Sequence, residues 1–242
     1  MEYPFTFATY RYLLGSLREA GYSSAPFSEA MPMLQAGKRL VLLRHDVDFD
    51  VQAAVNLAEI DAEERYPSTF FFLLRSPHYN LFSPEASDAV HRIVAQGHRV
   101  GLHFDCANYS PDSRVSDLAV ACRREVGILQ GWFKISIDAV SYHRPSTQVL
   151  SGDPELSHPY PHTYLPLYTK DMHYCSDSRG QWRFGFPLDT QAFREKKPLH
   201  LLVHPIWWTE TDQPPVDKLR AFLELQARQL DRSVAANCVV FK

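Results

Sequence analysis

Short apolar runs with the composition of β-strands alternate along this chain with longer stretches of helical periodicity. The strand-like runs lie at residues 39–43, 69–74, 98–104, 135–142, 173–177, 199–204 and 237–241. Helical stretches lie at 51–65, 84–96, 113–130 and 216–230, and a first amphipathic helix ends near Gly21. Strands that alternate with helices pair in parallel through right-handed crossovers, so the pattern restricts the chain to an α/β fold. We expect a distorted (β/α) barrel of about seven parallel strands.

A single domain is expected over residues 1–242, because α/β barrels commonly reach this length and no repeat or linker interrupts the sequence. The stretch 145–170 departs from the alternation. It contains five prolines, at positions 145, 154, 159, 161 and 166, where a barrel helix would otherwise be expected. Long loops in compact domains are usually functional or mobile. We therefore expect a rim or lid over the site, whose shortening at 153–161 leaves the fold intact.

The composition excludes several classes of protein. The formal net charge of −3 gives no reason to expect a nucleic-acid binder, and no apolar run approaches the roughly 20 residues that span a bilayer. The four cysteines are scattered without a CxxC pair, as expected of free thiols in a reducing compartment. The N-terminal stretch lacks the basic segment and apolar core of a signal peptide. The expected location is therefore the cytoplasm.

Ionisable side chains, mostly His and Asp, follow five of the predicted strands at the point where each strand ends. They are His45, Asp46 and Asp48 after the first strand, His103 and Asp105 after the third, His143 and Arg144 after the fourth, Asp177 after the fifth, and His204 after the sixth. The carboxyl ends of parallel strands meet on one face of a barrel, where active sites are built. The pattern therefore predicts an active site at the C-terminal strand ends.

Asp46 and Asp48 lie two residues apart, so the period of a strand places both carboxylates on the same face. Asp48 could bind a metal while Asp46 acts as a base. His45 points the other way and is expected to pack behind the strand. Carboxylate and imidazole ligands with an open position for water are typical of a catalytic divalent metal such as zinc.

The order and spacing of these motifs resemble a divergent branch of the polysaccharide deacetylase family (carbohydrate esterase family four, the chitooligosaccharide-deacetylase homology domain). The resemblance spans residues 40–208. The family's Asp-Asp motif corresponds to 44–48, its Gly-His-x-Ile-Gly-x-His run to 97–103, its Arg-x-Pro motif to 143–146, its later aspartate motif to Asp177 and its Leu-x-His motif to 202–204. Two departures are that Val47 separates the two aspartates and that the Arg-x-Pro motif is shortened to Arg144-Pro145.

The resemblance implies metal-dependent hydrolysis of an acetyl group, usually an N-acetyl group, on a sugar or glycan precursor. In such a reaction Asp46 would act as general base and His204 would protonate the leaving amine. Arg144 would pair with Asp46 and keep it ionised. Asp177 would orient His204 or Arg144, or would be only a turn residue before Gly180.

The third metal ligand is left open by the sequence. Asp48 and His103 are two expected ligands, but Ala107 stands where the family has its second metal histidine. Asp105 is the nearest replacement if the strand continues, because it would then share the face of His103. Asp105 could instead cap the following loop, and His143 or His204 could reach in from neighbouring strand ends.

Aromatic residues near the motifs fit a sugar-binding pocket, since flat rings pack against the apolar face of a pyranose. The candidates are Tyr142, Trp182, Trp207 and Trp208. Of the adjacent pair, Trp207 and Trp208, one is expected to face the ligand and the other to be buried. Two other functions stay open: a metal-dependent amidase that acts on a small non-sugar amide, and a catalytically silent sugar-binding barrel.

Overall fold

The apolar run that follows Lys38 forms the central strand of a parallel sheet. The structure, a computed structural model, describes residues 3–110 and 112–241, and in this part of the chain seven strands pair in one sheet. The strands are β1 (Ser23–Ser24), β2 (Leu40–Val47), β3 (Thr69–Phe72), β4 (Arg99–Asp105), β5 (Ile137–His143), β6 (His173–Ser176) and β7 (Leu199–Val203). Their order is β5-β4-β3-β2-β7-β6, with β1 paired to β2, and every pair is parallel. The predicted α/β class is confirmed.

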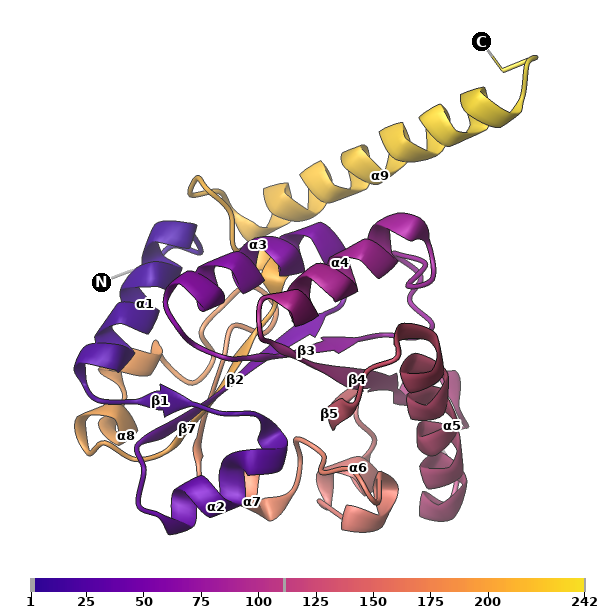
Figure 1. The fold of residues 1–242 in the computed structure, drawn as a ribbon. Helices are drawn as coiled ribbons and strands as arrows, with labels where there is room; N and C mark the ends of the chain where they lie inside the picture. Colours follow the sequence, from indigo (N-terminus) through magenta and orange to yellow (C-terminus); the bar gives the residue numbers. More distant parts are fainter. Residues whose placement is uncertain (1–2, 111, 242) are drawn as a thin grey trace.

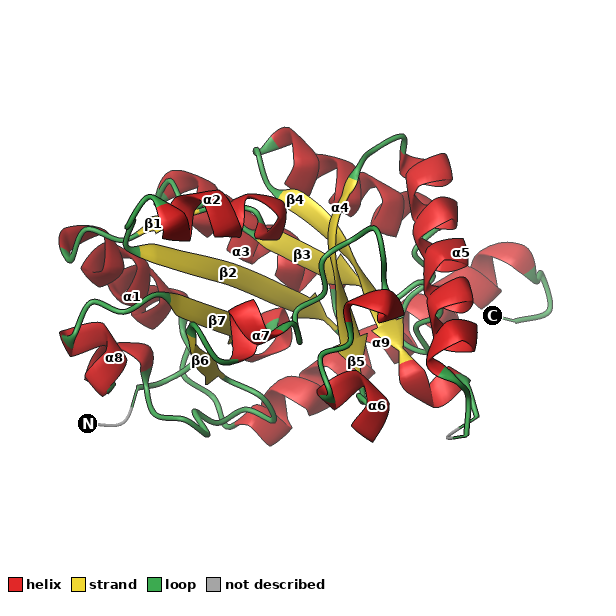
Figure 2. Cartoon of the chain, turned by 90° about the horizontal axis from the view of Figure 1, so that it is seen from below, coloured by secondary structure: helices red, strands yellow, loops and turns green. Residues whose placement is uncertain are grey.

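Helices connect most of the strands (Figures 1 and 2). They are α1 (Phe7–Glu19), α2 (Ala30–Gln35), α3 (Val51–Glu63), α4 (Pro84–Ala95), α5 (Val115–Phe133), α6 (Thr147–Leu150), α7 (Pro166–Thr169), α8 (Gln191–Arg194) and α9 (Pro215–Asn237). Side-chain oxygens of Thr6, Asp50 and Ser83 accept hydrogen bonds from the first free N–H groups of α1, α3 and α4. These caps fix where each helix begins.

The side chains on the two faces of β2 pack in different parts of the core. Val41 and Leu43 point outward and pack in the core beneath the helices, whereas Leu40 and Leu42 point inward. The inward pair packs with Phe71 of β3 and with residues of α7, which lies beside α2 at the N-terminal end of the strands (Figure 1). The amino-terminal half of the barrel interior is therefore filled mostly with apolar side chains, together with the buried Thr69, Asp138 and His200. This leaves only the C-terminal half for a site.

Gly101 on β4 is required by this packing. A Cβ atom added there would lie 2.3 Å from the Phe71 ring and 2.8 Å from the Ala139 carbonyl oxygen. Any side chain at this position would push β3, β4 and β5 apart.

The barrel is open between its terminal strands, because β5 and β6 lie at the two ends of the strand order. The proline-rich stretch spans this opening with two four-residue helices, α6 and α7, in place of a barrel helix. Val140 donates a backbone hydrogen bond to Pro161, and Thr163 donates one back to Val140. Leu156, Ser157 and His162 of this stretch are fully buried. The segment is thus part of the core on one side, which argues against the expectation that it can be shortened freely.

The expectation of a last strand at residues 237–241 is wrong. Helix α9 continues to Asn237, and Val239 and Val240 are 82% and 97% exposed. The β-branched composition of this stretch favours a strand, but a strand forms only where a partner edge is within reach. The seventh strand is instead the two-residue β1, which the sequence did not predict because it is polar and short.

None of the helices in the described residues is both long and apolar enough to cross a membrane. The four cysteines are free thiols, and three of them are buried.

Candidate active site

Strand β2 and its neighbours carry polar side chains inward just above the apolar floor. Arg44 and Asp46 lie on β2, and Asp48 follows the strand directly. His103 lies on β4, while Ser141 and His143 lie on β5. His204 follows β7. The alternation of side chains along each strand brings these residues together at the C-terminal end of the barrel.

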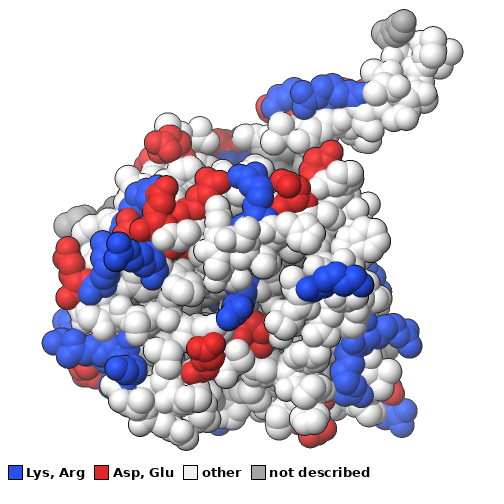
Figure 3. Space-filling view, in the orientation of Figure 1, with Lys and Arg blue, Asp and Glu red and all other residues white. Residues whose placement is uncertain are grey.

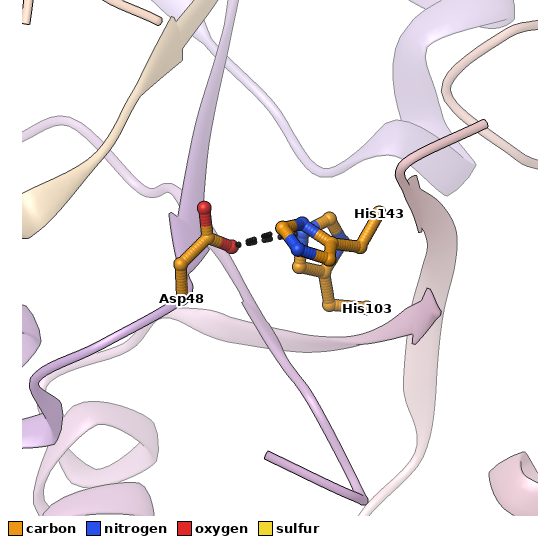
Figure 4. Close-up of side chains that lie close together, drawn as sticks. All are labelled: Asp48, His103 and His143. Atoms are coloured by element: carbon orange, nitrogen blue, oxygen red, sulfur yellow. Dashed lines mark ion pairs between the residues drawn. The ribbon is translucent and has the colours of Figure 1, made fainter. Parts of the chain in front are cut away.

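Asp48, His103 and His143 form a group whose nitrogen and oxygen atoms all lie within 4.8 Å of one another (Figure 4). Asp48 Oδ1 lies 3.1 Å from His103 Nε2 and 3.5 Å from His143 Nδ1. One carboxylate and two imidazoles form a ligand set suited to zinc and similar divalent ions. The sequence left Asp105, His143 and His204 open as the third ligand, and the structure places His143 in this group.

The orientation of His103 fits a metal at this point. Its Nδ1 lies 2.9 Å from Ser141 Oγ, a hydroxyl that also accepts a hydrogen bond from Arg44 and donates toward Asp46. When Nδ1 of His103 donates to Ser141, Nε2 is left with a lone pair that can bind a cation beside Asp48.

Asp46 is held as an anion at the base of the group. Arg44 donates from Nε to Asp46 Oδ1 (2.8 Å) and from Nη2 to Asp46 Oδ2 (2.7 Å), and both side chains are buried. Burial raises the pKa of Asp46, but the Arg44 guanidinium together with His103 and His204 outweighs burial and holds the pKa well below its usual range. Asp46 Oδ2 is 3.6 Å from His103 Nε2, so this carboxylate borders the group of potential ligands.

His204 is held as a cation on the other strand beside β2. Its Nδ1 lies 2.6 Å from Oδ1 of Asp177, a fully buried carboxylate that also accepts from the His204 backbone N–H and from Trp208 Nε1. Burial lowers the pKa of His204, but Asp177, aided by Asp48 and Asp46, outweighs this effect and raises the pKa to about 9. The other ring nitrogen, Nε2, lies 3.9 Å from Asp48 Oδ2. The His204 imidazole and the Asp46 carboxylate thus lie beside the same group of potential ligands, Asp48, His103 and His143.

A cavity of about 950 Å³ opens over these residues. Its wall includes Asp46, Asp48, His103, His143 and His204, and Trp207 borders it although this side chain is only 6% exposed. Trp208 is 2% exposed and packs against Tyr10 and Phe5, so both tryptophans are buried and only Trp207 reaches the cavity wall. Tyr164, Tyr174, Phe49 and Phe184 also line the cavity. Their sequence positions carry no motif, so the sequence offered no signal for them.

The remaining aromatic candidates lie less directly at the site. Tyr142 borders the cavity but is 2% exposed and packs in the outer core with Phe104. Its neighbours Ser141 and His143 point inward, so Tyr142 points outward by the strand period. Trp182 is half-buried against Phe5 and Phe186. Of the four aromatic candidates, Trp207 and Tyr142 border the cavity, and both are almost fully buried.

The expected pairing of Arg144 with Asp46 is corrected by the structure. Arg144 forms its ion pair with Asp105, which also accepts from the backbone N–H of Ala107. Burial raises the pKa of Asp105, but Arg144, the Ala107 N–H and His143 together outweigh burial and lower it. Asp105 is therefore engaged in closing its own loop and lies outside the group of ligands. Arg44, which sequence reasoning missed, takes the role expected of Arg144, and its place two residues before Asp46 was the available signal.

Comparisons with known proteins give a limited result. No protein-family model matches the chain, and no curated protein matches it. Among solved structures, a chitin deacetylase from the fungal pathogen Colletotrichum lindemuthianum has 19% identity and a TM-score of 0.43, covering 78% of this chain and 82% of that one. A mutant CE4-family pseudoenzyme with restored enzymatic activity has 14% identity and a TM-score of 0.45, over 79% of this chain and 64% of that one.

A T48 deacetylase with substrate has 16% identity and a TM-score of 0.38, over 79% of this chain and 84% of that one. At these scores the similarity carries no argument about the chemistry of this chain. The case for its function depends on the residues of the site.

Proposed function

We propose that the protein is a metal-dependent hydrolase that removes an acetyl group, in the first instance an N-acetyl group, from a sugar or glycan precursor. One observation carries the proposal: the Asp46 carboxylate, paired with Arg44, and the His204 imidazole, paired with Asp177, border the same group of potential metal ligands in one cavity. Hydrolysis of an amide needs a base that takes a proton from water and an acid that gives one to the amine. The motif resemblance to polysaccharide deacetylases supports the same reaction.

Asp48, His103 and His143 would hold the metal, with Ser141 fixing the ring of His103. When bound, a divalent ion polarises the acetyl carbonyl and lowers the pKa of its water. Asp46 would accept the proton of the attacking water. Its bidentate contact with Arg44 holds the carboxylate still and maintains its charge.

His204 would protonate the leaving amine. The Asp177 carboxylate keeps the imidazole protonated at neutral pH and orients it through Nδ1, so that Nε2 is free to donate. Trp207 would pack against the sugar ring. Cytoplasmic action is part of the proposal and is supported by the free thiols.

The competing functions make different predictions for this site. An amidase for a small non-sugar amide would use the same residues but would not need Trp207. A silent sugar-binding protein would need neither the buried Arg44–Asp46 pair nor the His204–Asp177 pair, since binding requires no proton transfer. Both pairs are present and buried, and this favours an enzyme.

The test combines metal analysis of freshly purified protein with acetate release from a panel of acetylated sugars and small amides. We expect one divalent ion per chain and acetate release from at least one sugar. His103→Ala should lose both the ion and the activity, whereas His91→Ala, an exposed histidine on α4, should lose neither. Acetate release from small amides alone would show that the protein is an amidase. Sugar binding without acetate release would show that it is a sugar-binding protein and not an enzyme.

A further inference from the structure

Four arginines line the cavity, and two of them have no acidic partner. Arg44 pairs with Asp46, and Arg144 pairs with Asp105. For Arg179 and Arg183, the described residues 3–110 and 112–241 contain no carboxylate within ion-pair distance, although both side chains line the cavity. The only acids in the cavity wall are Asp46 and Asp48, which already face Arg44 and the histidines. The outer cavity therefore carries two uncompensated positive charges.

Both arginines belong to one loop, residues 177–186, which is anchored at the catalytic residues. Its first residue, Asp177, is fully buried and accepts hydrogen bonds from His204 and Trp208. The Gly180 N–H donates to the Asp177 carbonyl (3.0 Å), and this closes a turn with Arg179 at its corner. The first residue of this loop, Asp177, thus orients His204, and the outer part of the loop presents Arg179 and Arg183 to the cavity.

The backbone at Arg179 is held in a conformation that residues other than glycine rarely adopt, with φ of 63°. Next to it, a Cβ atom added to Gly180 would lie 2.7 Å from the Cβ of Pro215. The chain therefore packs closely against the start of α9 at this point, so the turn has little freedom. Retained backbone strain of this kind is concentrated at ligand-binding segments.

We propose, on the basis of the function proposed above, that the substrate carries an anionic group in addition to its acetyl group, and that Arg179 and Arg183 bind this anion. A guanidinium binds phosphate or carboxylate through two parallel hydrogen bonds. The acetyl group would lie at Asp48, His103 and His143, and the anion at the arginines. The cavity volume of about 950 Å³ exceeds what a single acetylated monosaccharide fills. The substrate class is an acetylated sugar with a phosphate or a carboxylate.

The experiment compares substrates that differ only at carbon 6: N-acetylglucosamine, its 6-phosphate and its 6-carboxylate (uronic acid) form. For the wild type we expect kcat/KM to be at least about tenfold higher for one or both anionic sugars, and this preference to fall as salt is added. Whichever anionic sugar is preferred identifies phosphate or carboxylate as the group bound. Equal values for all three sugars would overturn the inference.

The variants Arg179→Gln and Arg183→Gln test the assignment to residues. Each should raise KM for the anionic sugar several-fold while leaving kcat and the neutral sugar unchanged, and the double variant should abolish the preference. Arg99→Gln is the matched control, because Arg99 is an exposed arginine at the opposite, N-terminal end of β4. An unchanged KM in the double variant would overturn the inference.

Direct binding separates this inference from the proposed function. Calorimetric titration of the wild type and the double variant with the anionic sugars requires no turnover. Binding that depends on Arg179 and Arg183, without acetate release from any sugar, would support the anion site and reject the deacetylase. Acetate release with binding that is indifferent to both arginines would support the deacetylase and reject the anion site.

Discussion

Asp46 and His204 are held in opposite protonation states by partners on their own or the adjacent strand, Arg44 and Asp177. If they are base and acid, Asp46→Asn and His204→Ala should each lower kcat by roughly 100-fold or more with modest effects on KM, because both act in the transition state. Steady-state kinetics of acetate release would measure the effect. Asp61→Asn is not a suitable control, because Asp61 is buried among Tyr10, His45 and Ser68. Asp189→Asn, on an exposed turn, is suitable and should keep full activity.

The pH dependence of activity follows from the Asp177 contact. His204 must be protonated to act as an acid, so activity should be present below its pKa of about 9 and be lost as the pH rises through that value. Asp177→Asn removes the charge that raises the pKa, and the alkaline limb of kcat against pH should move to lower pH. An alkaline limb at the same pH in wild type and Asp177→Asn would show that another group titrates there.

The ligand group makes a prediction that separates His143 from Asp105. Replacing His143 with Ala should reduce the metal content strongly, since it removes one of three donors. Asp105→Ala should leave the metal content near one ion per chain, because Asp105 contacts Arg144 and the Ala107 N–H instead. Metal analysis after gel filtration measures both. If Asp105→Ala loses the ion and His143→Ala keeps it, Asp105 and not His143 is the third metal ligand.

The sequence alone revealed those site residues whose positions follow from the period of a strand. Asp46, Asp48 and His103 were identified because strand ends on one face must converge. The partner of Arg144 could not be found in this way. Arg144 follows β5 with φ of 49°, outside the strand geometry, and this turns its side chain toward Asp105. Pairings made by residues just beyond a strand depend on local backbone angles that periodicity does not specify.

At the scale of elements, the alternation of strands and helices predicted six of the strands within a few residues, because most of them are runs of buried and largely apolar side chains. The strand predictions fail at two places, where the composition of a segment does not match its burial in the structure. The polar strand β1 is fixed by pairing with β2 and not by its own side chains. The β-branched residues at 239 and 240 are exposed because no sheet edge receives them.

The proline-rich segment is expected to be essential for stability. Deleting residues 153–161 would remove buried Leu156 and Ser157 and the Pro161 carbonyl that accepts from Val140 of β5. It would also remove the Asp153 carbonyl from His162 Nε2. Losing a buried leucine alone costs about 2–5 kcal/mol. We therefore expect the deletion variant to lose its cooperative thermal unfolding transition. Circular dichroism as a function of temperature measures this transition. Unfolding at the wild-type temperature would show that the segment is a detachable rim.

At the scale of the whole molecule, the shape divides the chain into a barrel body and one projecting helix (Figure 1). Lys and Arg are interspersed with Asp and Glu on the face seen in Figure 3, and α9 extends away from the body. Only its first turns are anchored: Lys218 Nζ donates to the carbonyl oxygens of Phe5 and Trp207, and Phe222 packs against Phe49. These contacts connect α9 to the segment that follows His204.

The two halves of α9 should therefore differ in their contribution to stability. Phe222 is 5% exposed, so Phe222→Ala should lower the free energy of unfolding by about 3–5 kcal/mol. Leu230 is 66% exposed, so Leu230→Ala should change it by about 0.5 kcal/mol or less. Removal of residues 227–242 should likewise leave the unfolding midpoint in urea nearly unchanged. A large loss of stability in Leu230→Ala would mean that the outer half of α9 is covered in solution by a surface that the single chain does not supply.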